Sequence, residues 1–122
     1  MGTTILIVDD DPKNVKLFRD VLQANGYSTI EAENGKLGVE LAFAHKPALI
    51  LMDIMLPVLN GFEAVRILKS DAKTKSIPVI ALTSHAMQGD KEKALEAGFN
   101  GYITKPINVR EFLKEISKFI TS

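Results

Sequence analysis

The chain has 122 residues, of which 46% are hydrophobic and 25% charged, a composition typical of one soluble globular domain. Fifteen Lys and Arg residues balance fifteen Asp and Glu residues, so the formal net charge is zero and the composition does not favour nucleic-acid binding. The longest apolar runs are far shorter than the roughly 18 residues of a membrane span, and the N-terminus does not resemble a secretory signal. Because the chain also has no cysteine, a cytoplasmic protein is the default expectation.

Short β-branched runs alternate with stretches of helical period along the whole chain, which is the pattern of repeated βαβ units. No linker, low-complexity tract or internal repeat interrupts this alternation, so we expect a single domain over residues 1–122. The expected strands are Ile5–Val8, Ser28–Ala32, Ala48–Met52, Pro78–Leu82 and Gly101–Thr104.

Each expected strand is followed by an expected helix. The first, about Pro12–Asn25, has proline in its first turn and ends before Gly26. The last, Val109–Ile120, has the clearest apolar face, and Asn108 with Glu111 predicts its N-terminal cap. The helices expected between them are Lys36–Ala44, Gly61–Lys69 and a segment of weak periodicity that ends at Ala97.

Strand composition also predicts the order of the sheet, because a strand buried on both faces is continuously apolar and an edge strand is mixed. The first, third and fourth strands are apolar, whereas the second contains Ser28 and Glu31 and the fifth contains Tyr102 and Thr104. We therefore expect an α/β fold of the (βα)5 type, a three-layer sandwich whose parallel sheet has the order 2-1-3-4-5. In this order strands one and three meet at a switch point, where open α/β sheets bind ligands.

Polar residues follow the carboxyl ends of these strands. They are Asp9, Asp10 and Asp11 after the first, Asp53 after the third, Thr83 and Ser84 after the fourth, and Lys105 after the fifth. Singly, the acids can be helix caps and Lys105 a solvated cation. Together, carboxylates in one crevice repel one another and need a proton or a cation, and Mg²⁺ prefers such oxygen ligands. Lys105 and the Thr83 hydroxyl would then complete a site in which Asp53 accepts a phosphoryl group.

Four motifs along the chain resemble those of the receiver domain of bacterial-type two-component response regulators. They are IVDDD at residues 7–11, LMDIMLP at 51–57 followed by Gly61, ALTS at 81–84 and YITKP at 102–106. The resemblance extends from Thr4 to Ile120 and implies a flavodoxin-like fold. Within the family, the chain is most similar to stand-alone receivers of the DivK type and to receivers of hybrid histidine kinases.

The resemblance implies a role for each site residue. Asp53 is the implied nucleophile and phosphorylation site, and Lys105 and Thr83 would contact its phosphoryl group. Thr83 and Tyr102 would form the switch pair, and Lys105–Pro106 would be a cis peptide. The implied ligands of Mg²⁺, which Mn²⁺ can replace, are Asp9, Asp10, Asp53 and the carbonyl of Met55.

Some positions depart from the commonest family pattern, namely Asp11, Asn60 and Ser84, but none of them removes a required group. Met55 and His85 occupy the two family positions whose side chains flank the phosphoryl group and set its lifetime. The alternative for His85 is a solvent-exposed loop residue.

Three other functions fit parts of the pattern. Aspartate-based phosphohydrolases carry a general acid two residues after the nucleophile, where this chain has Met55. A flavin-binding module would need a loop rich in Gly, Ser and Thr after the first strand, and this loop is acidic. A scaffold without phosphorylation would not need the complete set of acids, Thr83 and Lys105.

We therefore expect a phosphorylation switch and not an enzyme that turns over an external substrate. Its expected phosphodonor is a histidine kinase or a histidine phosphotransferase, and its expected target is another protein, with no nucleic acid and no membrane involved. The fourth helix, fifth strand and fifth helix form the expected output surface, and a monomer or weak dimer is expected. Since the chain ends after the last expected helix, we expect no output domain in it, either because it is stand-alone, which we favour, or because it was cut from a larger protein.

Overall fold

The computed structural model describes residues 3–83 and 90–120. Strands and helices alternate through these residues, as predicted from the sequence. Their order is β1 (Thr4–Val8), α1 (Pro12–Ala24), β2 (Ser28–Ala32), α2 (Gly35–His45), β3 (Leu49–Asp53), α3 (Gly61–Ser70), β4 (Val79–Thr83), α4 (Asp90–Ala97), β5 (Gly101–Thr104) and α5 (Val109–Phe119).

Three strands differ from the prediction by one residue, and the first of them, β1, begins one position earlier, at Thr4. Both β3 and β4 begin and end one position later, so that Asp53 and Thr83 are the last residues of their strands and not the first residues after them. The ladder extends this far because Asp53 pairs with Leu82 of β4 and Thr83 pairs with Thr104 of β5. Two polar residues of the predicted site therefore have strand backbone geometry.

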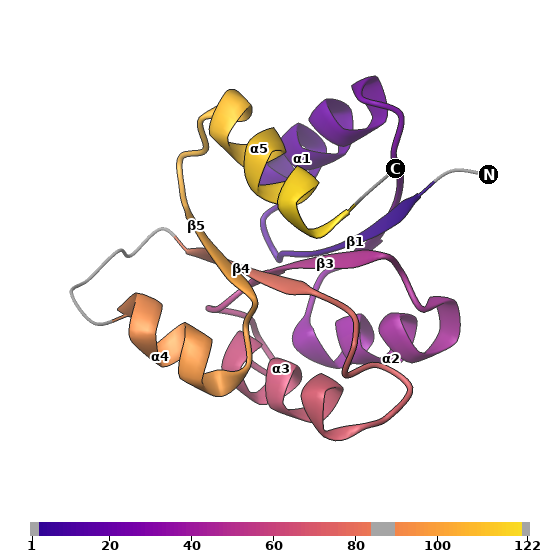
Figure 1. Ribbon diagram of the computed structural model, residues 1–122, viewed down its shortest axis with the longest axis vertical. Coiled ribbons are helices and arrows are strands. Elements are labelled where there is room, and N and C mark those ends of the chain that lie inside the picture. Colours follow the sequence, from indigo (N-terminus) through magenta and orange to yellow (C-terminus); the bar gives the residue numbers. More distant parts are fainter. Residues whose placement is uncertain (1–2, 84–89, 121–122) are drawn as a thin grey trace.

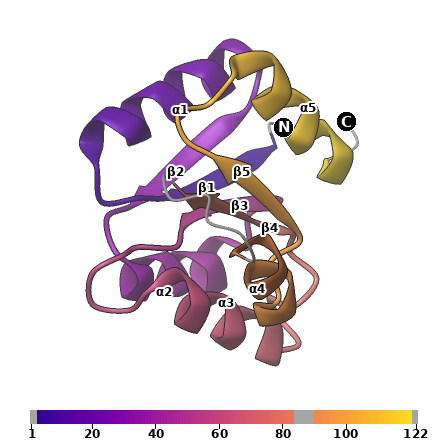
Figure 2. The same cartoon turned by 90° about the vertical axis from the view of Figure 1, so that its left-hand side faces the viewer.

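The five strands form one parallel sheet in the order β2-β1-β3-β4-β5, which confirms the predicted order. Helices α1 and α5 cover one face of the sheet, and α2, α3 and α4 cover the other (Figure 1). The view at right angles shows the same three layers (Figure 2). No helix in the described ranges is long and apolar enough for a membrane span.

Each face of the sheet has its own apolar core, because side chains alternate along a strand. Ile5 and Ile7 point toward α1 and α5, where Phe18 and Phe112 stack with ring centroids 5.3 Å apart. The core on the other face contains Val8 and several small helix residues such as Ala42, Ala64 and Ala94. The alternation also determines toward which face of the sheet a polar residue at the end of a strand points.

Side-chain caps fix where several helices begin. The predicted cap of α5 is confirmed, because the Glu111 backbone N–H donates to Asn108 Oδ1 at 3.1 Å. A reciprocal capping box, which was not predicted from the sequence, is formed at α3 by Asn60 and Glu63. This box fixes the start of α3 directly after the loop that follows Asp53.

Candidate functional site

Strand register explains why two acids distant in sequence lie side by side. Val8 pairs with Met52, so the next residues along the two strands, Asp9 and Asp53, are neighbours. Val8 and Met52 point into the core under α2 and α3. Because side chains alternate, Asp9 and Asp53 start from the opposite face, toward α1 and α5.

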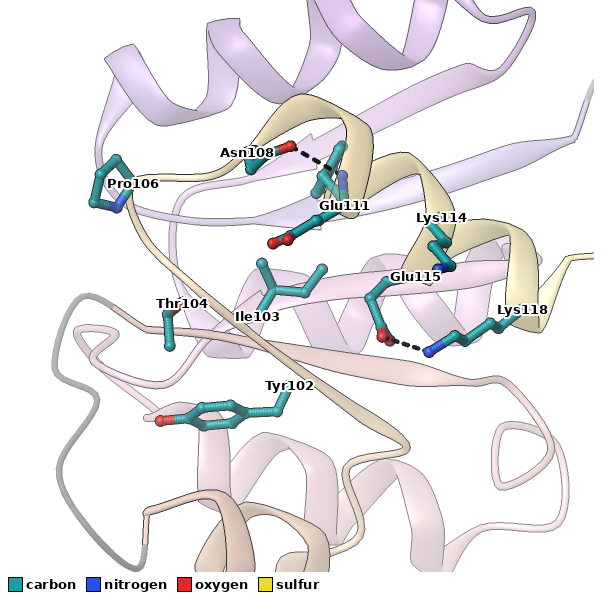
Figure 3. A pocket seen from close by; sticks show the side chains of 10 residues that line it. Tyr102, Ile103, Thr104, Pro106, Asn108, Glu111, Lys114, Glu115 and Lys118 are labelled. Carbon is teal, nitrogen blue, oxygen red and sulfur yellow. Dashed lines mark hydrogen bonds and ion pairs between the residues drawn. The ribbon is translucent and has the colours of Figure 1, made fainter.

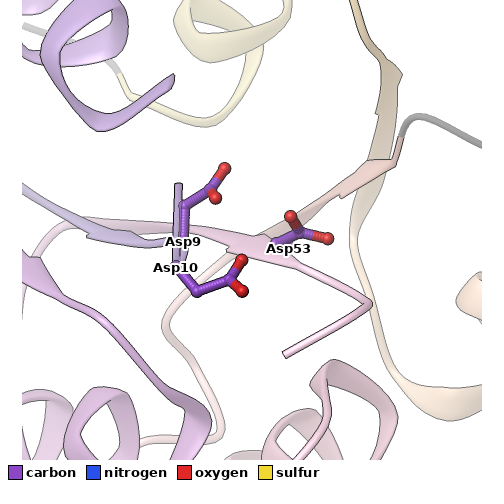
Figure 4. A group of neighbouring side chains, drawn as sticks. All are labelled: Asp9, Asp10 and Asp53. Carbon is purple, nitrogen blue, oxygen red and sulfur yellow. The ribbon is translucent and has the colours of Figure 1, made fainter. Parts of the chain in front are cut away.

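Asp9, Asp10 and Asp53 form a cluster at the carboxyl ends of β1 and β3 (Figure 4). One oxygen from each carboxylate lies within 4.8 Å of the others. Asp9 and Asp53 are buried, whereas Asp10 is exposed. The third predicted acid, Asp11, has a different role, because its side chain accepts the Lys13 backbone N–H at 2.9 Å and caps α1.

Lys105 crosses from β5 to the acid cluster. Its Nζ lies 2.9 Å from Asp9 Oδ2 and 2.7 Å from Asp53 Oδ2, and it is the cation that joins the two buried acids. Ile103, two positions earlier, points into the core under α1 and α5, so Lys105 starts from the same face as these acids. The peptide bond between Lys105 and Pro106 is cis.

Burial shifts the pKa values of Asp9 and Lys105 in this cluster. Burial raises the pKa of the Asp9 carboxyl, and the hydrogen bond from Lys105 reverses only part of that rise. Burial alone would lower the pKa of Lys105, but the hydrogen bonds to Asp53 and Asp9 outweigh it, and the pKa is raised. Lys105 is therefore a permanent positive charge at neutral pH, while ionised Asp9 is held at a free-energy cost.

The donor chemistry of the cluster fits a hard divalent cation. Three carboxylates face a single ammonium group, so ionised acids leave excess negative charge that a cation would neutralise. Oxygen donors at this separation suit Mg²⁺, which takes few protein carboxylates and completes its octahedron with water and phosphate oxygens. The Met55 backbone lies beside the cluster, because its N–H donates to Asp53 Oδ1 at 2.9 Å.

The loop between β3 and α3 depends on the absence of a side chain at Gly61. A Cβ there would lie 2.6 Å from the Asp53 carbonyl oxygen and 2.7 Å from Ile54 Cα, distances at which the backbone would have to shift. The Gly61 N–H also donates to the Ile54 carbonyl at 2.9 Å. The glycine thus permits α3 to begin in direct contact with the strand that ends at Asp53.

The predicted switch residues start from the opposite face of the sheet to the buried acids, at or near the same ends of the strands. Tyr102 pairs with Ala81 of β4 and packs against the core under α3 and α4, and Thr83 lies two residues after Ala81. Thr83 is buried; Tyr102 is half-buried, with a buried hydroxyl oxygen. The predicted inward movement of the Tyr102 ring stays a prediction. Ser84 and His85 lie outside the described residues.

A groove of about 370 Å³ runs between β5 and α5. Figure 3 shows the Tyr102 ring on the side of β5 away from α5, whereas Ile103 points toward α5. Polar α5 residues line the groove, with Glu115 paired to Lys118 at 2.8 Å. Because Tyr102 is one of the residues that line the groove, a change in the position of its side chain would alter this surface. The surface belongs to the output surface expected from the sequence.

Comparisons with known proteins point to one family. Residues 5–117 match the family model described as the response regulator receiver domain. The chain is 45% identical over 120 residues to the polar-differentiation response regulator DivK of Brucella anthropi, with 98% of each sequence covered. It is 44% identical over the same length to the protein of that name from Brucella ovis.

Solved structures show the same similarity. The receiver domain of a sensor histidine kinase from Pseudomonas aeruginosa, with a magnesium ion coordinated in its active site cleft, has a TM-score of 0.92 at 36% identity, and 100% of each chain is covered. A chain from the co-crystal structure of a Saccharomyces cerevisiae histidine phosphotransfer protein with the receiver domain of its downstream response regulator has a TM-score of 0.89 at 32% identity. There, 97% of this chain and 88% of the other are covered.

Proposed function

This chain belongs to the response regulator receiver domain family of two-component signalling, and we propose that it is a phosphorelay switch phosphorylated on Asp53. The observation that carries the proposal is the junction of Asp53 with Asp9, Asp10 and Lys105 at the carboxyl ends of the strands. The donor is the phosphohistidine of a histidine kinase or a histidine phosphotransferase. A histidine phosphotransfer partner is present in the co-crystal structure of a similar receiver, which supports this class of donor.

In the transfer step, a carboxylate oxygen of Asp53 attacks the phosphorus of the phosphohistidine. A P–O bond forms, the P–N bond breaks, and its electron pair stays on the imidazole nitrogen, which then takes a proton from solvent. The Met55 N–H and Lys105 hold the two Asp53 oxygens in place before transfer. Lys105 then pairs with the phosphoryl oxygens as a fixed positive charge, and the Thr83 hydroxyl donates to one of them.

Mg²⁺ is the cation that the site is proposed to use, and Mn²⁺ can take its place. The proposed ligands are Asp9, Asp10, Asp53 and the carbonyl oxygen of Met55. When bound, the cation supplies positive charge against the acids and the phosphate oxygens. The magnesium in the cleft of the similar Pseudomonas receiver supports this choice.

The domain assists its own phosphorylation but does not turn over an external substrate. Met55 stands two residues after Asp53, where aspartate-based phosphohydrolases carry their general acid, and its thioether cannot donate a proton. The Met55 side chain is also exposed. The output is a changed affinity for another protein, since the chain carries no net positive charge of the kind that favours nucleic-acid binding.

Mass spectrometry after incubation with Mg²⁺ and acetyl phosphate tests the proposal. The wild type should gain one acid-labile phosphoryl group, chelation of Mg²⁺ should abolish the gain, and Asp53→Asn should prevent it. Asp11→Asn is the matched control, because Asp11 is close in sequence but caps α1 outside the cluster. Labelling of Asp53→Asn as fast and as full as the wild type would disprove the assignment.

A Mg²⁺ titration tests the metal ligands separately. Asp10→Ala should weaken Mg²⁺ binding, since it removes one of the three clustered carboxylates. Asp11→Asn should bind Mg²⁺ as the wild type does. Equal affinity in Asp10→Ala would remove Asp10 from the ligand set.

A further inference from the structure

The two most exposed large hydrophobic side chains among the described residues both lie in the loop directly after Asp53. Met55 is 67% exposed and Val58 is 76% exposed. The other large hydrophobic residues on the described surface lie on helices and are 42–45% exposed. Pro57, between the two, is exposed as well. We call Met55, Pro57 and Val58 the apolar rim.

The backbone holds Val58 outward in a conformation that β-branched residues rarely adopt. Its φ is 70°, and the Leu59 N–H donates to the Pro57 carbonyl at 2.7 Å, which closes a three-residue turn around Val58. A turn of this kind is strained for valine and relaxed for glycine. Neither the conformation nor the exposure of Val58 stabilises the folded chain. Both features therefore indicate that the side chain contacts another molecule.

Neighbouring segments keep the apolar rim in this position. The Leu59 carbonyl packs so closely on Gly35, at the start of α2, that a Cβ there would collide with it. At the next residue, the capping box of Asn60 and Glu63 anchors the start of α3. Leu59 and Asn60 thus fix the end of the loop that directly follows Val58, and Val58 cannot turn inward without moving α2 or α3.

The position of the apolar rim beside Asp53 indicates which kind of molecule would contact it. Asp53 is buried, so a phosphohistidine on another protein reaches it only if the surface around that histidine lies against the edges of the site. Met55 is part of this edge, because its N–H is bonded to Asp53 itself. Such a surface would bury Met55 and Val58, whereas a small phosphodonor could reach Asp53 without touching Val58.

We propose that the apolar rim is the contact that seats the protein phosphodonor, a histidine phosphotransferase or kinase domain with an apolar surface beside its phosphohistidine. This inference rests on the proposed function of Asp53. Val58 is a specificity-determining residue that favours protein donors over small ones. The strain at Val58 is retained because an exposed apolar side chain at this position shortens the search for the correct docking geometry and slows dissociation.

The test compares two phosphodonors on the same variants. Val58→Gly removes the side chain and suits the positive φ, and Val58→Asn keeps a side chain that tolerates it. From the fastest donor in a panel of purified, phosphorylated histidine phosphotransfer proteins and kinase domains, both variants should be labelled roughly tenfold more slowly than the wild type, the scale of one lost interface anchor. From acetyl phosphate with Mg²⁺, both should be labelled at the wild-type rate.

A control variant and a stability measurement complete the test. Ile67→Ala shortens an exposed apolar side chain on α3, away from the apolar rim, and should leave both rates unchanged. Val58→Gly should unfold at the same or a higher denaturant concentration than the wild type. An undiminished rate from the protein donor, an equal loss with both donors, or acetyl phosphate labelling without any transfer from the panel would each overturn the inference. Failure of acetyl phosphate to label the wild type would instead overturn the proposed function.

Discussion

Helices α4 and α5 lie on opposite faces of the same end of the sheet, and they are attached very differently. Helix α5 buries Phe112 and Ile116, and the Phe112 ring stacks on Phe18 of α1. Helix α4 has eight residues, and of its described side chains only Ala94 is buried. The free energy that holds a helix in place scales with the apolar area it buries, so α4 is the weakly held member of the pair.

This difference has a direct bearing on signalling. The buried acids and Lys105 start from the face of the sheet that α1 and α5 cover, where packing is firm. Thr83 and Tyr102 start from the face on which α4 lies, and α4 buries little apolar area to resist its own movement. A switch of this design changes its surface beside α4, which buries little apolar area, and keeps its chemistry on the face that α1 and α5 cover.

Truncation of one side chain in each helix should give the largest contrast. Phe112→Ala should lower the free energy of unfolding by about 3–5 kcal/mol, because it removes a stacked, fully buried ring. Leu95→Ala on α4 should cost about 0.5 kcal/mol or less, because Leu95 is exposed. Urea denaturation measures both values. Equal costs would show that α4 is held as firmly as α5.

The two helices also differ in how well the sequence predicts them. The apolar spacing of Val109–Ile120 and the cap at Asn108 identified α5 to within a residue of its observed end. The end of α4 at Ala97 was predicted from the glycine that follows it, but its start was not, because a helix that buries only Ala94 leaves no apolar stripe in the sequence. The sequence signal for α4 and its packing energy are both weak because the helix buries so little apolar surface.

The next contrast concerns the switch pair. Addition of Mg²⁺ and beryllium fluoride, a phosphoryl mimic, should shift the amide signals of β4, α4 and β5, including Tyr102, more than those of α1 and α2. Thr83→Ala should remove the response of Tyr102, because no hydroxyl is then drawn toward Asp53. The expected coupling of about 1–3 kcal/mol corresponds to a change of about 5–150-fold in partner affinity. Signals that move only in α1 and α2 would contradict this output path.

The residues of the candidate site could be predicted from the sequence, but not all the contacts between them. The order of the strands follows from their polarity, and it brings the acids and Lys105 to one edge. The bond from Lys105 to both buried acids could not be predicted, since it depends on side-chain reach across β4. The conformation of Val58 was also missed, because it runs against the backbone preference of valine. The sequence signal that could have indicated this exposed loop was the presence of two apolar residues, Met55 and Val58, between β3 and α3.

On the face of the sheet that α1 and α5 cover, the contacts within the acid cluster should oppose folding. In excess chelator, Asp53→Asn should raise the free energy of unfolding by about 1 kcal/mol, because it removes one of three clustered charges and keeps an oxygen for Lys105. The exposed Asp10 should give a smaller gain when changed to Asn. Asp11→Asn, outside the cluster, is the control. Equal or lower stability in Asp53→Asn would mean that Lys105 already balances the cluster.

The smallest effect concerns Lys69, which helps to hold the end of α4. Its side-chain stem packs against Gly98, the residue after α4, and its Nζ donates to the backbone carbonyls of Lys75 and Ile77 at 3.1 and 2.7 Å. Burial lowers the pKa of Lys69 below its ordinary value of 10.5. The folded protein therefore loses this proton at a lower pH than the unfolded chain does, so the contribution of Lys69 to stability should increase as pH rises through the lowered pKa toward 10.5.

Lys69→Met keeps the apolar stem and removes both hydrogen bonds and the charge. The stability of the wild type relative to Lys69→Met should grow as pH rises toward 10.5, since only the wild type is then relieved of a buried charge. Lys73→Met, an exposed position in the loop before β4, corrects for the general titration of lysines. A difference that stays flat or shrinks with pH would show that the Lys69 ammonium is not held at a cost, and that burial at the end of α4 is looser than its contacts with Gly98 and the two carbonyls imply.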